Sequence, residues 1–181
     1  ITLGVIGDAG VSPGGTVSLT ALELNLNPVV ISKIVEHGGK KIGYLFYAQY
    51  IANYNESLDT AFQHFADAQV DDVVLDLRYN PGGGTIAAQH LCSSLAPLDA
   101  VNTSATLVTF KWNNKYQTYW EEQNVPQQLK IQLVDDVQVK LGLSKLYVLT
   151  GPGTASASEL TITGLKPYMP VTTIGGTTYG K

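Results

Sequence analysis

The chain is organised around one stretch, Gly151-Pro-Gly-Thr-Ala-Ser156-Ala-Ser-Glu159. The residues before it, 145–150, form an apolar, strand-like run, so we predict a strand that ends in the Gly/Pro turn. Ser156 and Glu159 match the S-x-x-E capping box, which predicts that a helix begins at Ser156. A serine at this position lies beside unpaired backbone N–H groups and the positive end of the helix dipole. Those surroundings can stabilise a developing oxyanion.

Ser156 is open to two interpretations. Most serines of a capping box only cap their helix, and the local pattern alone favours that role. A nucleophilic serine also needs a base, and Lys181 could supply one if a strand at residues 171–175 runs back beside the serine turn. A lysine amine accepts a proton only when it is uncharged. We therefore expect Lys181 to be buried among Tyr179, Ile174 and other apolar groups.

Two further segments carry a family resemblance. Leu75-Asp-Leu-Arg-Tyr-Asn-Pro-Gly-Gly83 resembles the D-L-R-x-N-P-G-G motif of the C-terminal processing proteases, also called tail-specific proteases. Ile42-Gly-Tyr-Leu45 resembles their I-G-Y strand. The segments around Ser156 and Lys181 are similar to those that hold the serine and lysine of that family. The motifs stand in the family's order and cover roughly residues 41–181.

The resemblance implies a serine peptidase with a Ser/Lys dyad. In such an enzyme Ser156 attacks the scissile carbonyl and Lys181 takes its proton. The backbone N–H of Gly82 or Gly83, together with that of Ala157, would form the oxyanion hole. The sequence leaves the choice between the two glycines open, and Pro followed by three glycines also has a purely structural explanation as a sharp strand-to-helix turn.

Three positions bear on how completely the chain matches this family. Glu159 stands where some relatives hold a supporting glutamate, although helix capping explains it equally well. Other relatives use an acidic residue eleven positions after the serine, and Pro167 occupies that position here, so the role has no carrier. A glutamine that often assists the lysine lies beyond Lys181, where the sequence stops. We therefore expect these 181 residues alone to have weak or no activity.

Composition excludes several classes of protein. The 181 residues are 44% hydrophobic and 14% charged, which is typical of one soluble domain. No apolar run approaches the roughly 18 residues of a membrane span. A net charge of −4 provides no basic face for nucleic acid. The histidines fit no metal-ligand spacing, so we predict neither a metal nor a cofactor.

Cys92 is the only cysteine, so the chain cannot form an internal disulfide. His90 lies close by in sequence, but residues at that spacing do not face each other on a helix. A Cys/His dyad is therefore a weak hypothesis, and we predict a buried structural thiol.

The order of predicted elements indicates an α/β fold, because strands alternate with helices. Strands are expected at residues 41–50, 72–78, 145–150 and 171–175, and helices at 56–68, 85–96 and 156–166. An inserted β-hairpin is predicted from strands 106–112 and 115–120, with aromatic side chains that pack against a sheet or line a peptide groove. The family resemblance narrows the fold to that of the Clp protease and crotonase superfamily.

We divide the chain into a leading segment, residues 1–40, and a protease core, residues 41–181. Residues 1–15 are predicted as a loop or a sheet edge, and residues 17–24 alternate like a strand. In the resembled family a peptide-binding PDZ domain commonly precedes the core. Residues 17–24 could be the strand that leaves such a domain, which these residues would then lack.

Two other functions are compatible with the predicted fold. A non-catalytic peptide-binding module would keep the groove without the chemistry, and a crotonase-type enzyme would use the oxyanion hole on acyl thioesters of coenzyme A. The presence of both Ser156 and Lys181 favours the peptidase. The family resemblance further implies polypeptide substrates with unstructured or C-terminal segments, and a location in the bacterial cell envelope or periplasm.

Overall fold

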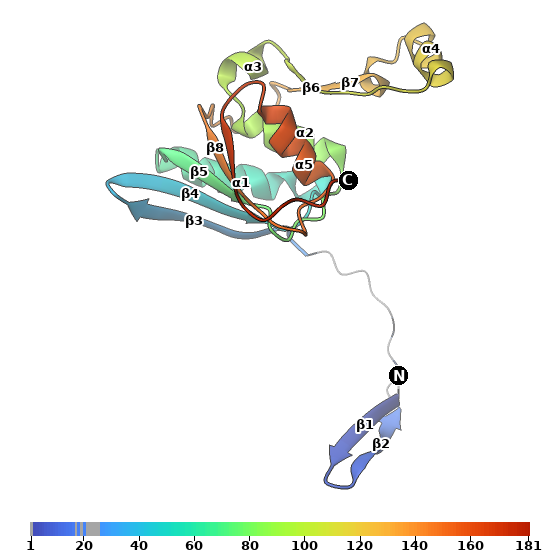
Figure 1. Cartoon of the computed structure of the whole chain (residues 1–181). Coiled ribbons are helices and arrows are strands. Elements are labelled where there is room, and N and C mark those ends of the chain that lie inside the picture. The colour runs from blue at the N-terminus through green and yellow to red at the C-terminus, as the bar shows by residue number, and fades with distance from the viewer. Residues whose placement is uncertain (1, 17, 19, 21–25) are drawn as a thin grey trace.

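The computed structural model describes residues 2–16, 18, 20 and 26–181 of the chain. Its centre is a five-stranded sheet (Figure 1) with the spatial order β3 (Val29–His37), β4 (Lys40–Tyr47), β5 (Asp72–Asp76), β8 (Leu146–Thr150) and β9 (Val171–Gly175). β3 and β4 form an antiparallel pair. β4, β5, β8 and β9 are parallel neighbours.

Three helices cover one face of this sheet (Figure 1): α1 (Asn55–Asp67), α2 (Thr85–Leu95) and α5 (Ala157–Leu165). Beneath them, Leu45, Leu75 and Val148 are paired across neighbouring strands and are fully buried. Gly43 brings α1 close to the sheet, because a Cβ at this position would lie 2.8 Å from the ring of Phe65. Burial of this apolar face is the main force that holds helices and sheet together.

The remaining elements are β1 (Thr2–Gly7), β2 (Gly10–Thr16), α3 (Leu98–Asn102), β6 (Thr106–Thr109), α4 (Asn114–Glu122), β7 (Lys130–Gln132) and two 3₁₀ helices, η1 (Ala52–Tyr54) and η2 (Pro126–Gln128). β1 pairs with β2, and β6 pairs with β7, each as a separate antiparallel sheet. In the described part of the chain, no helix is both long enough and apolar enough to cross a bilayer.

The predicted α/β architecture is confirmed. Apart from the hairpin, every strand and helix predicted for the core is present, with ends that differ by at most two residues in all but one case. The exception is the strand predicted at 41–50, since β4 ends earlier, at Tyr47. β9 coincides with the predicted residues 171–175.

The N-terminal part differs from the prediction. Residues 1–15, predicted as a loop or edge, contain the β1–β2 hairpin, in which Gly10 follows the turn with a positive φ of +108°. The strand predicted at 17–24 lies almost entirely outside the described residues. β3 was not predicted, yet it pairs with β4 along most of its length. The five-stranded sheet therefore begins before residue 41.

The predicted hairpin is wrong in its second strand. β6 accounts for the first strand, but residues 115–120 belong to the helix α4. Asn113 caps this helix, because its side chain accepts the backbone N–H of Tyr116 at 3.1 Å. Asparagine is favoured both in turns and at helix N-caps, and in this structure Asn113 is an N-cap. β6 instead pairs with β7, so α4 and η2 form an insertion between two paired strands.

The sheet also brings the predicted site segments together. β5, β8 and β9 are parallel neighbours, so their carboxyl ends lie side by side at one edge. In parallel α/β sheets, ligand sites form outside this edge. The segments that leave it are the glycine-rich loop, the serine turn and the C-terminal residues 176–181. Three segments that are distant in sequence therefore meet in one place.

Candidate active site

Ser156 occupies the N-cap of α5, and its backbone is strained. Its φ of +55° and ψ of −115° lie outside the regions that a residue with a side chain ordinarily adopts. A serine that only caps a helix has extended backbone angles. Strain of this kind costs about 1–3 kcal/mol and clusters at functional sites. The conformation therefore distinguishes Ser156 from an ordinary capping serine.

Hydrogen bonds fasten the serine turn to the loop after β5. The hydroxyl of Thr154 donates to the carbonyl oxygen of Leu77 at 2.7 Å. The N–H of Ala155 donates to the carbonyl oxygen of Asn80 at 3.1 Å. The buried hydroxyl of Ser158 donates to that same oxygen at 3.0 Å. The serine turn is thus held on both sides.

Gly82 and Gly83 bring their backbone against this turn. A Cβ on Gly82 would lie 2.7 Å from Cβ of Ser156 and 2.8 Å from N of Ala157, and its φ of +97° favours glycine. A Cβ on Gly83 would lie 2.3 Å from the carbonyl oxygen of Tyr50. Only glycine fits at these two positions. The backbone therefore approaches Ser156 with no side chain in between.

Two backbone N–H groups near Ser156 have no hydrogen-bond partner in the part of the chain that the structure describes: those of Gly83 and Ala157. Ala157 is the first residue of α5, where N–H groups have no acceptor within the helix. The N–H of Gly82, by contrast, donates to Oδ1 of Asn80 at 2.9 Å. Of the two candidate glycines, Gly83 is the one whose N–H is available to a ligand.

Glu159 joins the serine turn to the C-terminal segment. Its Oε2 atom accepts the N–H of Ser156 at 2.9 Å, as the predicted capping box requires, and the N–H of Lys181 at 3.0 Å. Its Oε1 atom accepts the N–H of Gly180 at 2.7 Å. Partial burial raises the pKa of the Glu159 carboxyl, but the hydrogen bond from Lys181 and those from neighbouring groups outweigh burial and bring the pKa to about 2. Glu159 is therefore charged at neutral pH.

The side chain of Lys181 does not lie in the apolar enclosure predicted for it. Lys181 is exposed, and Tyr179 and Ile174 are 71% and 51% exposed, so that prediction is wrong for this structure. The physical reason is that residues 176–181 run along the surface after the edge strand β9. In the part of the chain that the structure describes, the hydroxyl of Ser156 and the amine of Lys181 form no hydrogen bond with each other. The backbone of Lys181 reaches the serine turn, while its amine stays in solvent.

Cys92 and His90 take no part in this site. Cys92 is fully buried in α2, and burial raises the pKa of its thiol to about 12, which confirms a structural thiol. Nε2 of His90 lies 2.8 Å from Oδ1 of Asp59 on α1 instead. Among the described residues, no group of three His, Cys, Asp or Glu side chains could hold a metal ion.

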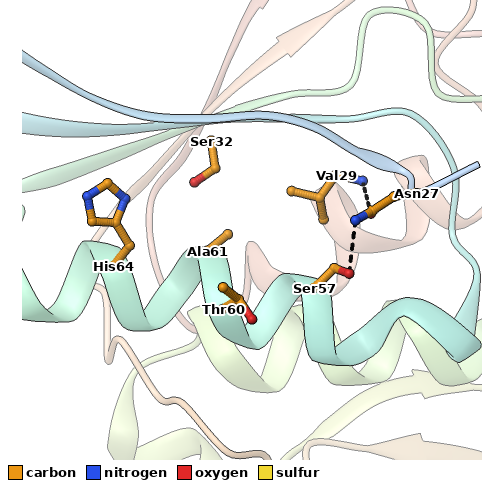
Figure 2. A pocket seen from close by; sticks show the side chains of 7 residues that line it. All are labelled: Asn27, Val29, Ser32, Ser57, Thr60, Ala61 and His64. Atoms are coloured by element: carbon orange, nitrogen blue, oxygen red, sulfur yellow. Dashed lines mark hydrogen bonds between the residues drawn. The ribbon is translucent and has the colours of Figure 1, made fainter.

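A cavity of about 400 Å³ lies apart from these residues, between β3 and α1 (Figure 2). It is lined by Asn27, Val29, Ser32, Ser57, Thr60, Ala61 and His64. Figure 2 shows Asn27 joined to Ser57 across its end, where the amide nitrogen and the hydroxyl are 3.0 Å apart. No residue predicted for catalysis lines this cavity, so we give it no role in the proposed chemistry.

Sequence reasoning missed the polar residues of the Leu75–Gly83 motif. Asp76 is buried, and its Oδ2 atom accepts the Arg78 guanidinium at 2.6 Å and the Tyr44 hydroxyl at 2.7 Å. Asn80 is buried between the glycine-rich loop and the serine turn. The available signal was the presence of polar residues at the end of an otherwise apolar strand.

Comparison with known proteins places these observations in a family. The sequence model of peptidase family S41 matches residues 41–181. A carboxyl-terminal-processing protease of Synechocystis sp. is 27% identical over 168 residues, which cover 91% of this chain and 34% of that protein. The chain therefore spans about a third of the length of the curated relatives it matches.

Solved structures agree with the fold. A crystal structure from Bacteroides fragilis that is assigned to the S41 proteases is 34% identical, with a TM-score of 0.76, over the whole of this chain and 47% of that chain. The photosystem II D1 C-terminal processing protease shows the same fold at 22% identity, with a TM-score of 0.63, over 96% of this chain and 42% of its own. The predicted fold class, that of the Clp protease and crotonase superfamily, is thereby confirmed. Because the family model matches more than half of the residues of this chain, the chain belongs to peptidase family S41.

Proposed function

We propose that the chain forms the core of a serine endopeptidase of the C-terminal processing type. The observation that carries this proposal is the strained backbone of Ser156, held against two unpaired backbone N–H groups. Membership of peptidase family S41 supports it, as does the similarity to a carboxyl-terminal-processing protease. Since the chain spans only part of that relative, the activity is proposed for the full-length protein.

The proposed reaction begins when Oγ of Ser156 attacks the carbonyl carbon of the scissile peptide bond. Its proton passes to Nζ of Lys181, which acts as the general base. The carbonyl oxygen becomes an oxyanion that accepts the N–H groups of Gly83 and Ala157. When the tetrahedral intermediate collapses, the C–N bond breaks and Lys181 returns the proton to the leaving amine. Water then hydrolyses the acyl-enzyme by the same steps.

Lys181 can act as a base only when it is shielded from water and faces Ser156. A bound peptide, or another part of the full-length protein, would supply this shielding by covering the exposed amine. The shared contact with Glu159 supports the pairing, because the backbone N–H groups of Ser156 and Lys181 bind the same carboxylate oxygen. We therefore expect these 181 residues alone to be weakly active or inactive.

The proposed substrates are polypeptides with unstructured or exposed C-terminal segments. The similarity to a carboxyl-terminal-processing protease of Synechocystis supports a preference for C-terminal segments. A location in the bacterial cell envelope is part of the same proposal. A panel of fluorogenic peptides with free or amidated C-termini measures the preference, and equal cleavage of both kinds would contradict it.

The decisive experiment compares Ser156→Ala with Ser57→Ala in the full-length protein. Ser57 lies on α1, where its hydroxyl contacts Asn27, and it serves as a matched control. We expect Ser156→Ala to abolish both peptide cleavage and labelling by a fluorophosphonate, and Ser57→Ala to retain both. Cleavage that survives Ser156→Ala would overturn the proposal.

The two other candidate functions predict different results. A non-catalytic peptide-binding module would bind the peptide but leave Ser156 unlabelled. A crotonase-type enzyme would be stabilised against heat by an acyl-coenzyme A, since ligands that bind the native state raise its melting temperature. We expect labelling of Ser156 and no thermal shift with acyl-coenzyme A.

A further inference from the structure

Asn80 is a polar residue with 0% exposure that bonds to each side of the candidate oxyanion hole. Its Oδ1 atom accepts the N–H of Gly82 at 2.9 Å, and its Nδ2 atom donates to the carbonyl oxygen of Tyr47 at 2.9 Å. Its backbone oxygen accepts the N–H of Ala155 at 3.1 Å and the hydroxyl of Ser158 at 3.0 Å. One buried residue therefore touches the end of β4, the glycine-rich loop and the serine turn.

We infer that Asn80 is the positioning residue of the oxyanion hole, an inference that rests on the proposed function. Its side chain holds the Pro81–Gly82 peptide unit, which directly precedes the unit that carries the Gly83 N–H, and its backbone oxygen holds the turn before Ala157. The two unpaired N–H groups belong to these two segments. Asn80 thus links these two segments and contributes to the separation and mutual direction of their N–H groups, while it touches neither the substrate nor the reacting atoms.

The hydrogen bond to Gly82 also determines which glycine is available. Gly82 is buried, and a buried N–H without a partner is costly, so Oδ1 of Asn80 satisfies it. Gly83 is exposed, and its N–H remains free for a substrate oxygen. Without Oδ1, the Gly82 N–H would have to find another acceptor, and a rotation of that peptide unit would move Gly83 as well.

Two hydrogen bonds to the backbone of Tyr50 should confine the effect of an Asn80 substitution to the glycine-rich loop and keep the protein folded. The N–H of Tyr50 donates to the carbonyl oxygen of Gly82 at 3.0 Å, and its carbonyl oxygen accepts the N–H of Gly84 at 2.9 Å. These bonds do not involve Asn80, so they keep the loop in place. Tyr50 anchors only the carbonyl oxygen of the Gly82–Gly83 peptide unit, so the loss of Asn80 would let this unit tilt about that bond and misdirect the Gly83 N–H. A displacement of about 1 Å can cost a catalytic site roughly 100-fold.

The test measures the full-length protein and its Asn80→Ala variant, with Ser156 titrated by a fluorophosphonate so that only active sites are counted. We expect kcat per titrated site on a fluorogenic peptide to fall about 100-fold, because one oxyanion donor is worth about that much. KM should stay within about twofold, since ground-state binding is untouched. The inhibition constant of a peptide aldehyde, which forms the tetrahedral oxyanion, should rise by the same factor as kcat falls.

Asn80→Asp is the conservative variant. It keeps an oxygen acceptor for the Gly82 N–H but loses the donor to Tyr47, so its kcat should recover to within about tenfold of the wild type. A purely structural role would instead lower the melting temperature and the fraction of titrated sites, while kcat per site stayed at the wild-type value.

The outcomes separate this inference from the proposed function. If Ser156→Ala cleaves peptide like the wild type, the proposed function fails. If Ser156→Ala is inactive while Asn80→Ala keeps the wild-type kcat and aldehyde affinity, only the positioning role of Asn80 is refuted. Should Asn80→Ala not fold, Asn80→Asp decides. Asn80→Asp keeps the oxygen that accepts the Gly82 N–H. If all of its sites are titrated by the fluorophosphonate and it is nevertheless as inactive as Ser156→Ala, the inference is refuted.

Discussion

The backbone N–H of Lys181 donates a hydrogen bond to Glu159, at 3.0 Å from the Oε2 atom of its carboxylate. Together with the N–H of Tyr179, which donates to the carbonyl oxygen of Thr154 at 2.9 Å, this bond holds a surface segment beside the serine turn. Glu159 was open to two interpretations, as a helix cap and as a support for the dyad. It caps α5 and tethers the C-terminal segment with the same oxygen atom, so the two roles coincide.

Replacing Glu159 by Gln should loosen the hold of the serine turn on Gly180 and Lys181, while the N–H of Tyr179 stays bonded to the carbonyl oxygen of Thr154 at 2.9 Å. The substitution keeps the size of the side chain but removes the charge that strengthens the hydrogen bonds from Gly180 and Lys181. We expect faster hydrogen exchange at these two N–H groups and at least a tenfold loss of peptidase activity in the full-length protein. Unchanged exchange in a folded Glu159→Gln variant would contradict the tethering role.

The same tether should depend on pH in acid only. The pKa of Glu159 in the folded chain, about 2, is below its ordinary value of 4.5, so its charge stabilises the folded state. This contribution is fully present above about pH 4.5 and is lost as the pH falls from there towards 2. The free energy of unfolding of wild type minus that of Glu159→Gln should therefore be constant at neutral pH and shrink below about pH 4.5. Urea titrations of both proteins measure it, and a constant difference down to pH 2 would contradict the assignment.

Gly82 and Gly84 offer a matched pair of alanine substitutions in one loop. A Cβ at Gly82 would collide with the serine turn at 2.7 Å, and its φ of +97° is unfavourable for alanine. A Cβ at Gly84 would meet its nearest neighbour only at 3.7 Å, and its φ of −71° is ordinary. We expect Gly82→Ala to abolish labelling of Ser156 by a fluorophosphonate, and Gly84→Ala to be labelled like the wild type. Equal labelling of the two variants would show that the close approach is not needed.

Much of the fold could be predicted because local pattern and tertiary structure agree in the core. The helices α1, α2 and α5 and the strand β9 follow from apolar spacing and turn residues that lie within each element. β3 was missed because Ser32-Lys33 and Glu36-His37 interrupt the regular alternation of apolar and polar residues, and this edge strand is stabilised by its pairing with β4. The insertion was misread because Asn113 suits a hairpin turn and a helix cap alike, and only the latter role is realised.

The candidate site could also be predicted only in part. Motifs identified Ser156 and the two glycines, but only the bond from Gly82 to Asn80 shows which glycine N–H is free. That bond links residues two positions apart and depends on a buried side chain, whose direction a sequence does not reveal. The exposure of Lys181 depends on the path of the chain after β9, which no local pattern determines.

Cys92 should be unreactive in the folded chain. It is fully buried, and burial raises the pKa of its thiol to about 12, so the nucleophilic thiolate is scarce at neutral pH. We expect no reaction with Ellman's reagent at pH 8 until urea unfolds the chain, and Cys92→Ala should keep the peptidase activity of the full-length protein. Rapid modification of the native thiol, with loss of activity, would instead revive a catalytic role for Cys92.

Arg78 should stabilise the chain through Asp76. Burial raises the pKa of the Asp76 carboxyl, but hydrogen bonds from Arg78 and Tyr44 outweigh it, so the pKa is lowered from 3.8 and the group is charged. Arg78→Ala would leave this carboxylate buried with fewer partners and should therefore lower the free energy of unfolding at pH 7. The difference from the wild type should shrink as the pH falls below about 3.8, where protonation removes the charge in both proteins. Urea unfolding at pH 7 and pH 3 checks this, and a cost that is equal at both pH values would contradict it.

The insertion formed by residues 111–128 should be dispensable for the stability of the core. Its helix α4 has no buried residue, and in Figure 1 it stands away from the five-stranded sheet. The flanking residues already meet, because the N–H of Phe110 donates to the carbonyl oxygen of Leu129 at 2.8 Å. Replacing residues 111–128 by Asn-Gly would close β6 and β7 with a tight turn. We expect the free energy of unfolding in urea to change by less than about 1 kcal/mol, whereas Leu133→Ala, at a fully buried position just after β7, should cost roughly 2–5 kcal/mol. A loss on the scale of Leu133→Ala would show that the aromatic side chains of the insertion pack onto the core, which is the first of the two interpretations that the sequence offers for them.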